Sequence, residues 1–307
     1  MCVIAAPAQA LAESAGTEAQ SAPAEPKGWL AYAYAGLAAA TVLALVALRA
    51  AGRRPLALGP RRVRWPLAPG PSLFLMLLLM VAGAAAASAA TQWLGSAADD
   101  VRGRAVASLA NYGAQLLLVA GIWWALAGAR RQHGTPAAGA ALPVGGARAA
   151  ALGALAMAIG WPVVQAGGAV ASTVQQSLSG VAAPDTAHRT LEAMGQSGDA
   201  AWIAATALVA VVLAPLSEEI LYRGALQQAL QGMGMPRLGS LASASALFAV
   251  AHWGSLVGGS EAGALVMLLM LGLIFGWAYE RTGSLWAPFT AHALFNAANL
   301  AIFLTQR

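Results

Sequence analysis

The stretch AAWIAATALVAVVLAPLSEEILY, residues 200–222, decides the fold of this chain. It is apolar over a length that lets a helix cross about 30 Å of hydrocarbon. Seven further apolar runs of similar length occur at residues 29–48, 72–94, 106–129, 149–172, 238–257, 262–279 and 284–304. The sequence therefore predicts an all-α fold, a polytopic transmembrane helical bundle of about eight spans.

The composition of the 307-residue chain agrees with a membrane location, because 59% of its residues are hydrophobic and only 9% are charged. Such a chain has too little polar surface to cover a water-soluble globule, so lipid has to cover it. The single cysteine, Cys2, excludes an internal disulfide. The net charge of +5 is not gathered into a basic patch interleaved with aromatic residues. We therefore expect the lipid bilayer as a partner and no nucleic acid.

Composition also divides the chain into four segments. Residues 1–28 are rich in Ala, Glu, Ser and Pro without apolar periodicity and are predicted to be a flexible extramembrane segment. Within them, residues 2–12 resemble the end of a secretory signal but lack a basic start, so both readings stay open. Residues 29–138 hold three predicted helices, residues 139–148 form a Gly/Ala/Pro linker, and residues 149–305 hold the remaining helices.

Basic residues predict how the bundle is oriented. They concentrate in the loop after the first predicted span and in the loop between the third and fourth, at Arg49, Arg53, Arg54, Arg61, Arg62, Arg64, Arg130, Arg131 and Arg148. Cytoplasmic loops carry an excess of such residues. We therefore expect these loops in the cytoplasm, both termini outside it, and a multi-pass protein of the cell membrane.

Charged residues at the end of the fifth predicted span are unusual. A charged group inside a span costs about 2.5 to 3.5 kcal/mol even on lenient scales, so it is a functional hypothesis by default. Glu219 and Arg223 are four residues apart, in the favourable order for an ion pair on one helix face. Glu218 points about a third of a turn away and is predicted to be available for chemistry. The alternative is a cluster of charges that snorkel to the membrane surface.

Two later spans carry polar residues at helical spacing. Phe248 and His252 share one face of the sixth span, and His292 and Asn296 share one face of the last. Each pair alone is better explained by packing or by hydrogen bonds between helices. Taken together with Glu218, they predict one polar cavity that activates water and stabilises an oxyanion.

Three motifs, E-E-x-x-x-R at residues 218–223, F-x-x-x-H at residues 248–252 and H-x-x-x-N at residues 292–296, occur in this order. With them, the chain resembles the CAAX protease and bacteriocin-processing (CPBP, Abi) family of intramembrane endopeptidases. The resemblance covers about residues 149–304, so it implies a CPBP-like protease core at residues 149–305.

The resemblance also implies a role for each residue of the motifs. Glu218 and His252 would bind and deprotonate the attacking water, and His292 and Asn296 would stabilise the tetrahedral oxyanion. The supporting residues would be Glu219, Arg223 and Phe248. The implied partner is a peptide or protein substrate; prenylated C-terminal peptides, secreted precursors and segments of membrane proteins all fit.

The sequence leaves the cofactor and the function class open. We expect no cofactor, with zinc held by Glu218, His252 and His292 as the alternative, because His₂Glu is a known catalytic zinc set. The chain lacks the compact H-E-x-x-H helix, which favours a glutamate-dependent over a metal-dependent endopeptidase. The rival functions are a catalytically idle membrane scaffold or immunity protein, and an ion- or proton-coupled transporter.

Two further expectations concern position. If the fifth span ends near residue 222, His252 lies deeper than Glu218, which predicts that the fifth span is bent or tilted. The other His and Glu residues of the later chain are expected in loops as ordinary solvated groups: His133, His188, Glu261 and Glu280.

Overall fold

The computed structural model describes residues 27–58, 65–95, 100–132, 146–181, 184 and 186–305. Within these ranges every regular element is a helix and no strand occurs, so the prediction of an all-α fold is confirmed. The predicted extramembrane segment 1–28 and linker 139–148 lie largely outside these ranges.

In the described residues, seven helices are long and apolar enough to cross a membrane. They are α2 (Lys27–Ala50), α3 (Pro69–Leu94), α4 (Val101–Gln132), α5 (Ala147–Ser179), the composite helix Ala200–Gly232, α11 (Glu261–Thr282) and α12 (Trp286–Thr305). The sixth predicted span, 238–257, is only the 15-residue helix α10 (Arg237–Ala251), followed by the 3₁₀ turn η3 (Trp253–Ser255). The molecule is thus a multi-pass membrane protein, close to the predicted eight spans.

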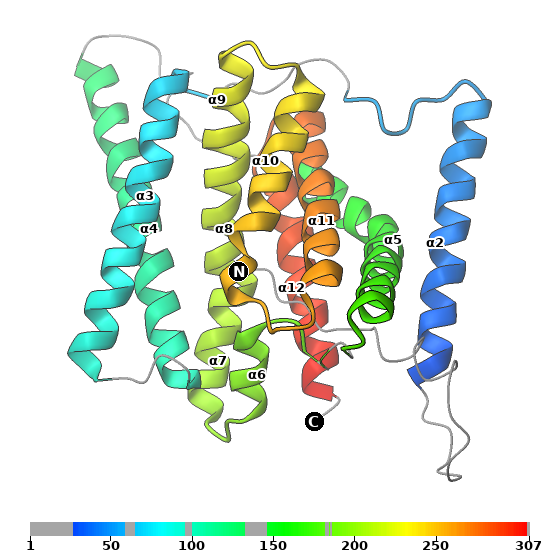
Figure 1. Cartoon of the computed structure of the whole chain (residues 1–307). Coiled ribbons are helices and arrows are strands. Elements are labelled where there is room, and N and C mark those ends of the chain that lie inside the picture. Colours follow the sequence, from blue (N-terminus) through cyan, green and yellow to red (C-terminus); the bar gives the residue numbers. More distant parts are fainter. Residues whose placement is uncertain are drawn as a thin grey trace.

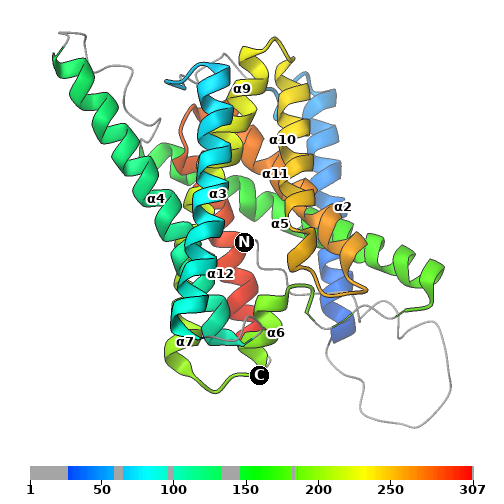
Figure 2. The ribbon, with the colours of Figure 1, turned by 60° about the vertical axis from the view of Figure 1, so that its left-hand side comes forward.

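The helices form a bundle in which α5, α11 and α12 pack against one another, α3 packs on α4, and α10 packs on α11 (Figures 1 and 2). The short helix α6 (Arg189–Gly195) lies at the end of the bundle where the chain enters the composite helix. The ends of α2 and α4, the start of α3 and the α9–α10 turn all lie at the opposite end of the bundle (Figure 1). The two arginine-rich loops therefore start from the same end, as the predicted orientation requires.

Small residues set the closest contacts between helices. A Cβ added at Gly272 would lie 2.9 Å from the Cβ of Ser245, so α10 and α11 approach as closely as a glycine allows. Gly276 is similarly tight, with Gln227 and Leu241 at 3.0 Å from such an atom. Gly254 and Gly258 are also four residues apart, but a Cβ added at either would meet no atom within 4 Å.

The composite helix runs through five segments without a break: α7 (Ala200–Leu208), the π-helix η1 (Val209–Leu213), α8 (Ala214–Glu219), the π-helix η2 (Ile220–Leu226) and α9 (Gln227–Gly232). Pro215 lacks the N–H that would bind the carbonyl of residue 211, which accounts for the irregular hydrogen bonding at η1. Short π-helical stretches inside α-helices often mark functional sites, and these two flank the segment that carries Glu218 and Glu219.

The length of this helix removes the expected mismatch in depth. Because the helix ends at Gly232 and not near residue 222, Glu218 lies about 21 Å from that end at 1.5 Å per residue. His252 lies about 22 Å from Arg237, where α10 starts on the other side of the α9–α10 turn. The two residues therefore reach the same depth, and the extra length of the composite helix brings them together.

Two of the four residues expected in solvated loops are buried, and that prediction is wrong for them. Glu280 lies inside α11 and is 0% exposed, because this helix continues to Thr282, beyond the predicted boundary at residue 279. His188 is 1% exposed and its Nδ1 accepts a hydrogen bond from the N–H of Thr190, which caps α6. Glu261 starts α11 and is partly buried, and His133 lies outside the described residues.

Glu280 is the centre of a buried polar cluster between α9, α10 and α11. Its Oε2 accepts two hydrogen bonds from Arg237, from Nε at 2.9 Å and Nη2 at 2.7 Å. Its Oε1 accepts from the side-chain amides of Gln227 at 2.9 Å and Gln231 at 2.5 Å. This one carboxylate therefore ties the start of α10 to the end of the composite helix.

Candidate active site

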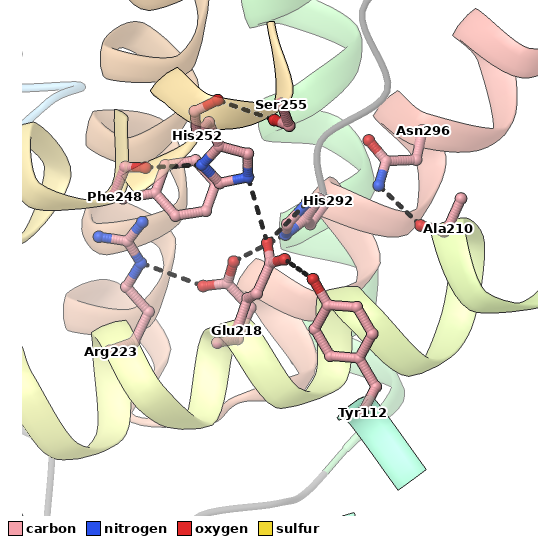
Figure 3. Close-up of polar contacts among 10 residues, drawn as sticks. Tyr112, Ala210, Glu218, Arg223, Phe248, His252, Ser255, His292 and Asn296 are labelled. Atoms are coloured by element: carbon pink, nitrogen blue, oxygen red, sulfur yellow. Dashed lines mark hydrogen bonds and ion pairs between the residues drawn. The ribbon is translucent and has the colours of Figure 1, made fainter. Parts of the chain in front are cut away.

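The first motif places two carboxylates with separate partners on α8. Glu219 forms the ion pair with Arg223 that the spacing predicts, with Nε and Oε2 3.0 Å apart and both side chains buried. Arg223 also lies over the ring of Phe248, with its guanidinium carbon 5.5 Å from the ring centroid. Glu218 makes a different set of contacts, which turn it toward the two histidines (Figure 3).

His252 caps the C-terminus of α10, where the helix gives way to the 3₁₀ turn. Its Nδ1 lies 2.7 Å from the carbonyl oxygen of Phe248. A carbonyl only accepts, so Nδ1 carries the proton and a neutral ring presents Nε2 as an acceptor. That Nε2 lies 3.9 Å from Oε2 of Glu218.

His292 comes from α12 and reaches the same oxygen. Its Nδ1 lies 2.9 Å from Oε1 of Glu219, and its Nε2 lies 3.8 Å from Oε2 of Glu218. The ring stacks on Phe275 with centroids 4.7 Å apart, and the edge-to-face contact with Phe248 measures 5.8 Å. Buried aromatic rings and Glu219 therefore fix the plane in which this imidazole faces Glu218.

The shared feature is that two imidazole Nε2 atoms face one carboxylate oxygen. Both histidines and Glu218 are buried, with at most 7% of each residue exposed. The separations of 3.8 and 3.9 Å exceed direct hydrogen-bond length. They suit a small polar group that bonds to the carboxylate and to an imidazole at the same time. Three of the four predicted catalytic residues thus meet at one point, from three different helices.

Asn296, the fourth, lies one turn beyond His292 on α12 and faces the π-helix η1 (Figure 3). Its side-chain amide donates a hydrogen bond of 2.7 Å to the carbonyl oxygen of Ala210, and the residue is fully buried. Asn296 therefore links the last helix to the irregular part of the composite helix.

Sequence reasoning missed Tyr112 of α4. Its hydroxyl donates a hydrogen bond of 2.8 Å to Oε1 of Glu218, which leaves Oε2 as the oxygen that faces the histidines. About one turn farther along α4, Gln115 accepts a hydrogen bond from the hydroxyl of Ser217, the neighbour of Glu218. The signal in the sequence is a run of polar residues at helical spacing inside the apolar stretch 106–129, with Ser108, Asn111, Tyr112 and Gln115 on adjacent turns.

A cavity of about 520 Å³ leads to these groups. Its walls come from α3, α4, the chain just before α6, the composite helix and the end of α10, and both Glu218 and His252 line it. Burial, together with the nearby Arg104 guanidinium, lowers the pKa of His188 in its wall to about 3, so this imidazole is neutral at pH 7. A cavity of this size admits a few residues of an extended peptide.

The candidate zinc ligands are Glu218, His252 and His292. Each histidine has its Nδ1 held by an acceptor and directs Nε2 toward Glu218, which is the arrangement that supporting residues give to metal-bound imidazoles. In the part of the chain that the structure describes, however, no group of three or more His, Cys, Asp or Glu side chains is spaced to hold a metal ion.

Residues 200–298 match the family model described as "Type II CAAX prenyl endopeptidase Rce1-like". This confirms the resemblance to the CPBP family and assigns a CAAX-protease-like fold to about a third of the chain, which includes Glu218, His252, His292 and Asn296. Helices α2 to α5, with Tyr112, lie outside the match. No curated protein and no solved structure matches the chain.

Proposed function

We propose that this chain is an intramembrane endopeptidase of the cell membrane that hydrolyses peptide bonds with a water molecule activated by Glu218 and His252. The observation that carries the proposal is the convergence of the Nε2 atoms of His252 and His292 on Oε2 of Glu218 at 3.9 and 3.8 Å. The match of residues 200–298 to an endopeptidase family supports it.

In the proposed reaction, water bonds to Oε2 of Glu218 and to the acceptor Nε2 of His252. Glu218 takes one proton as the water oxygen attacks the carbonyl carbon, and the carbonyl electron pair moves to oxygen. When the tetrahedral intermediate collapses, the C–N bond breaks and Glu218 returns the proton to the leaving nitrogen. Tyr112 holds Oε1 of Glu218 throughout, so Oε2 is the oxygen that transfers the proton.

His292 and Asn296 are the proposed donors to the oxyanion. His292 presents Nε2 to the reacting carbonyl while Nδ1 donates to Glu219. Both nitrogens donate in this role, so His292 enters the reaction as an imidazolium, and its charge faces the Glu219 carboxylate. Asn296 is assigned as the second donor, from the same side-chain amide that holds the carbonyl oxygen of Ala210. Preformed donors of this kind stabilise developing charge without reorganisation.

The experiment that tests this function is cleavage of a panel of fluorogenic peptides by the purified chain in proteoliposomes, with and without a zinc chelator. The panel contains a prenylated C-terminal peptide, a secreted-precursor segment and a membrane-protein segment. Cleavage that survives the chelator supports the glutamate-dependent reaction, whereas chelator-sensitive cleavage with bound zinc replaces it with the metal-dependent one. Failure to cleave any peptide favours the idle scaffold or immunity protein, and peptide-independent ion flux through the liposomes favours the transporter.

Tyr112→Phe is expected to lower kcat/KM by about 10-fold, because a hydrogen bond to a charged group contributes about 1.5 kcal/mol or more. The loss should fall mainly on kcat, since the hydroxyl acts on the reaction through its hydrogen bond to Glu218. Steady-state cleavage of one panel peptide measures it. Tyr34→Phe in α2 is the matched control and should leave kcat/KM unchanged. Equal rates for wild type and Tyr112→Phe would remove Tyr112 from the proposed mechanism.

A further inference from the structure

The cavity extends from Glu218 toward the end of the bundle where α6 lies. Tyr112 binds Glu218 in the first half of α4, and the cavity continues along this helix to Arg104 in its first turn. These eight residues rise about 12 Å at 1.5 Å per residue. Thr190 of α6 and Ser255 of η3 line the same part of the cavity. The lining residues therefore lead from the site to the end of the bundle at which α4 starts (Figure 1).

Packed side chains occupy the path from Glu218 toward the opposite end. Trp65 lies against Gly224 of the composite helix, where an added Cβ would lie 2.5 Å from the indole ring. The same ring contacts Trp123 of α4, with centroids 5.5 Å apart. Leu79 of α3 is 0% exposed and belongs to the hydrophobic core that Trp65 packs against. A substrate chain therefore reaches Glu218 from the α6 end.

Arginine residues distinguish the two ends. At the packed end, Arg237 starts α10, and Arg281 of α11 donates a hydrogen bond of 3.0 Å to the carbonyl oxygen of Ala57 in the chain that follows α2. The two arginine-rich loops also start from this end, and an excess of basic residues is typical of cytoplasmic loops. By this rule the packed end is the cytoplasmic one. The connections at the α6 end hold fewer basic residues, which in the described part of the chain are Arg102, Arg104 and Arg189.

We propose that the active site is reached from the extracytoplasmic side of the membrane and that its substrates are peptide segments exposed on that side. A secreted precursor or an extracytoplasmic segment of a membrane protein fits this access, whereas a cytoplasmic C-terminal peptide, prenylated or not, does not. The inference rests on the proposed endopeptidase function. An extended peptide advances about 3.3 Å per residue, so roughly three to four residues span the part of the cavity between Tyr112 and Arg104.

The test labels single cysteines from each side of the membrane. Cys2, the only cysteine of the chain, is first replaced by serine. Ser108→Cys and, separately, Ser255→Cys then report on the cavity, and Met233→Cys reports on the exposed α9–α10 turn. A membrane-impermeant maleimide is applied to intact cells that express the chain and to inverted membrane vesicles, and denaturation of a parallel sample shows that each thiol can react.

We expect both cavity cysteines to react in intact cells and to be protected in inverted vesicles, and Met233→Cys to show the reverse pattern. Two cavity positions keep the test decisive if one variant fails to fold. Cavity cysteines that react only in inverted vesicles, or in neither preparation, would overturn the proposed access. Reaction of Met233→Cys in intact cells would overturn the orientation on which it depends.

Cleavage separates this inference from the proposed function. Two single-span reporter proteins carry the same panel peptide, one on the extracytoplasmic side and one on the cytoplasmic side. The wild type should cut the extracytoplasmic reporter and leave the other intact, and Glu218→Gln should cut neither. Cleavage of the cytoplasmic reporter would overturn the inference but leave the endopeptidase function standing. Cavity cysteines that react in intact cells, in a wild type that cuts neither reporter, would instead overturn the proposed function alone.

Discussion

Glu218→Gln is expected to lower kcat/KM for peptide cleavage by about 100- to 10,000-fold, the range that a positioned general base contributes. The amide has almost the same shape and its oxygen still accepts the hydrogen bond from Tyr112, but it takes no proton from water. The loss should therefore appear in kcat, with the thermal unfolding temperature unchanged. Cleavage of a panel peptide by wild type and variant in proteoliposomes measures the difference.

Glu261→Gln is the matched control for this substitution. Glu261 is a partly buried glutamate at the start of α11, where it accepts a hydrogen bond from Gln175, and it does not line the cavity. Its replacement should change kcat/KM by about twofold at most, as surface substitutions away from the chemistry usually do. A Glu218→Gln protein that keeps more than a tenth of the wild-type rate would contradict the assignment of Glu218 as the base.

Glu280→Ala is expected to destabilise the protein by roughly 3 kcal/mol, near the lower end of what removal of one partner from a buried ion pair costs. The carboxylate is fully buried and accepts four hydrogen bonds, so its loss leaves Arg237, Gln227 and Gln231 with unpaired donors. Because this cluster fixes the start of α10, we also expect lower activity through misplacement of His252. Chemical unfolding in detergent, followed by helical circular dichroism, measures the free energy.

The control for this prediction is Glu261→Ala, at the other end of the same helix. Its carboxylate is partly exposed and bonds to Gln175 and the backbone N–H of Gly259, so about 1 kcal/mol or less should be lost. Equal stabilities of the Glu280→Ala and Glu261→Ala proteins would show that the cluster around Glu280 does not hold the α9–α10 turn together.

The sequence predicted the spans correctly where the apolar stretch and the helix have the same ends. The prediction failed where the helix ends before or after the apolar stretch does. Residues 238–257 are apolar over a full span, but the helix ends at Ala251 and a 3₁₀ turn follows. Hydrophobicity measures burial and not backbone conformation, so it gives no sign of this end. The reverse error occurred at residue 222, where charges suggested the membrane surface but the helix continues to Gly232.

The site was predictable to the extent that it depends on spacing within a helix. Glu219 and Arg223 pair at i and i+4, and Phe248 and His252 share a face. Contacts between distant helices were not predictable: the hydrogen bond from Tyr112 to Glu218 spans 106 residues of sequence. Glu280 was misplaced for a related reason, since a helix boundary predicted at residue 279, three residues before the end of α11, turns a buried carboxylate into a loop residue.

The most direct test of the proposed mechanism is a double-mutant cycle on Glu218 and His252, measured as kcat/KM for one cleaved peptide. If both side chains act on the same water molecule, Glu218→Gln and His252→Ala each remove the same step, and the double variant should be no slower than the slower single variant. Losses that multiply in the double variant would show that the two residues act independently, and would contradict the activation of one water molecule between them.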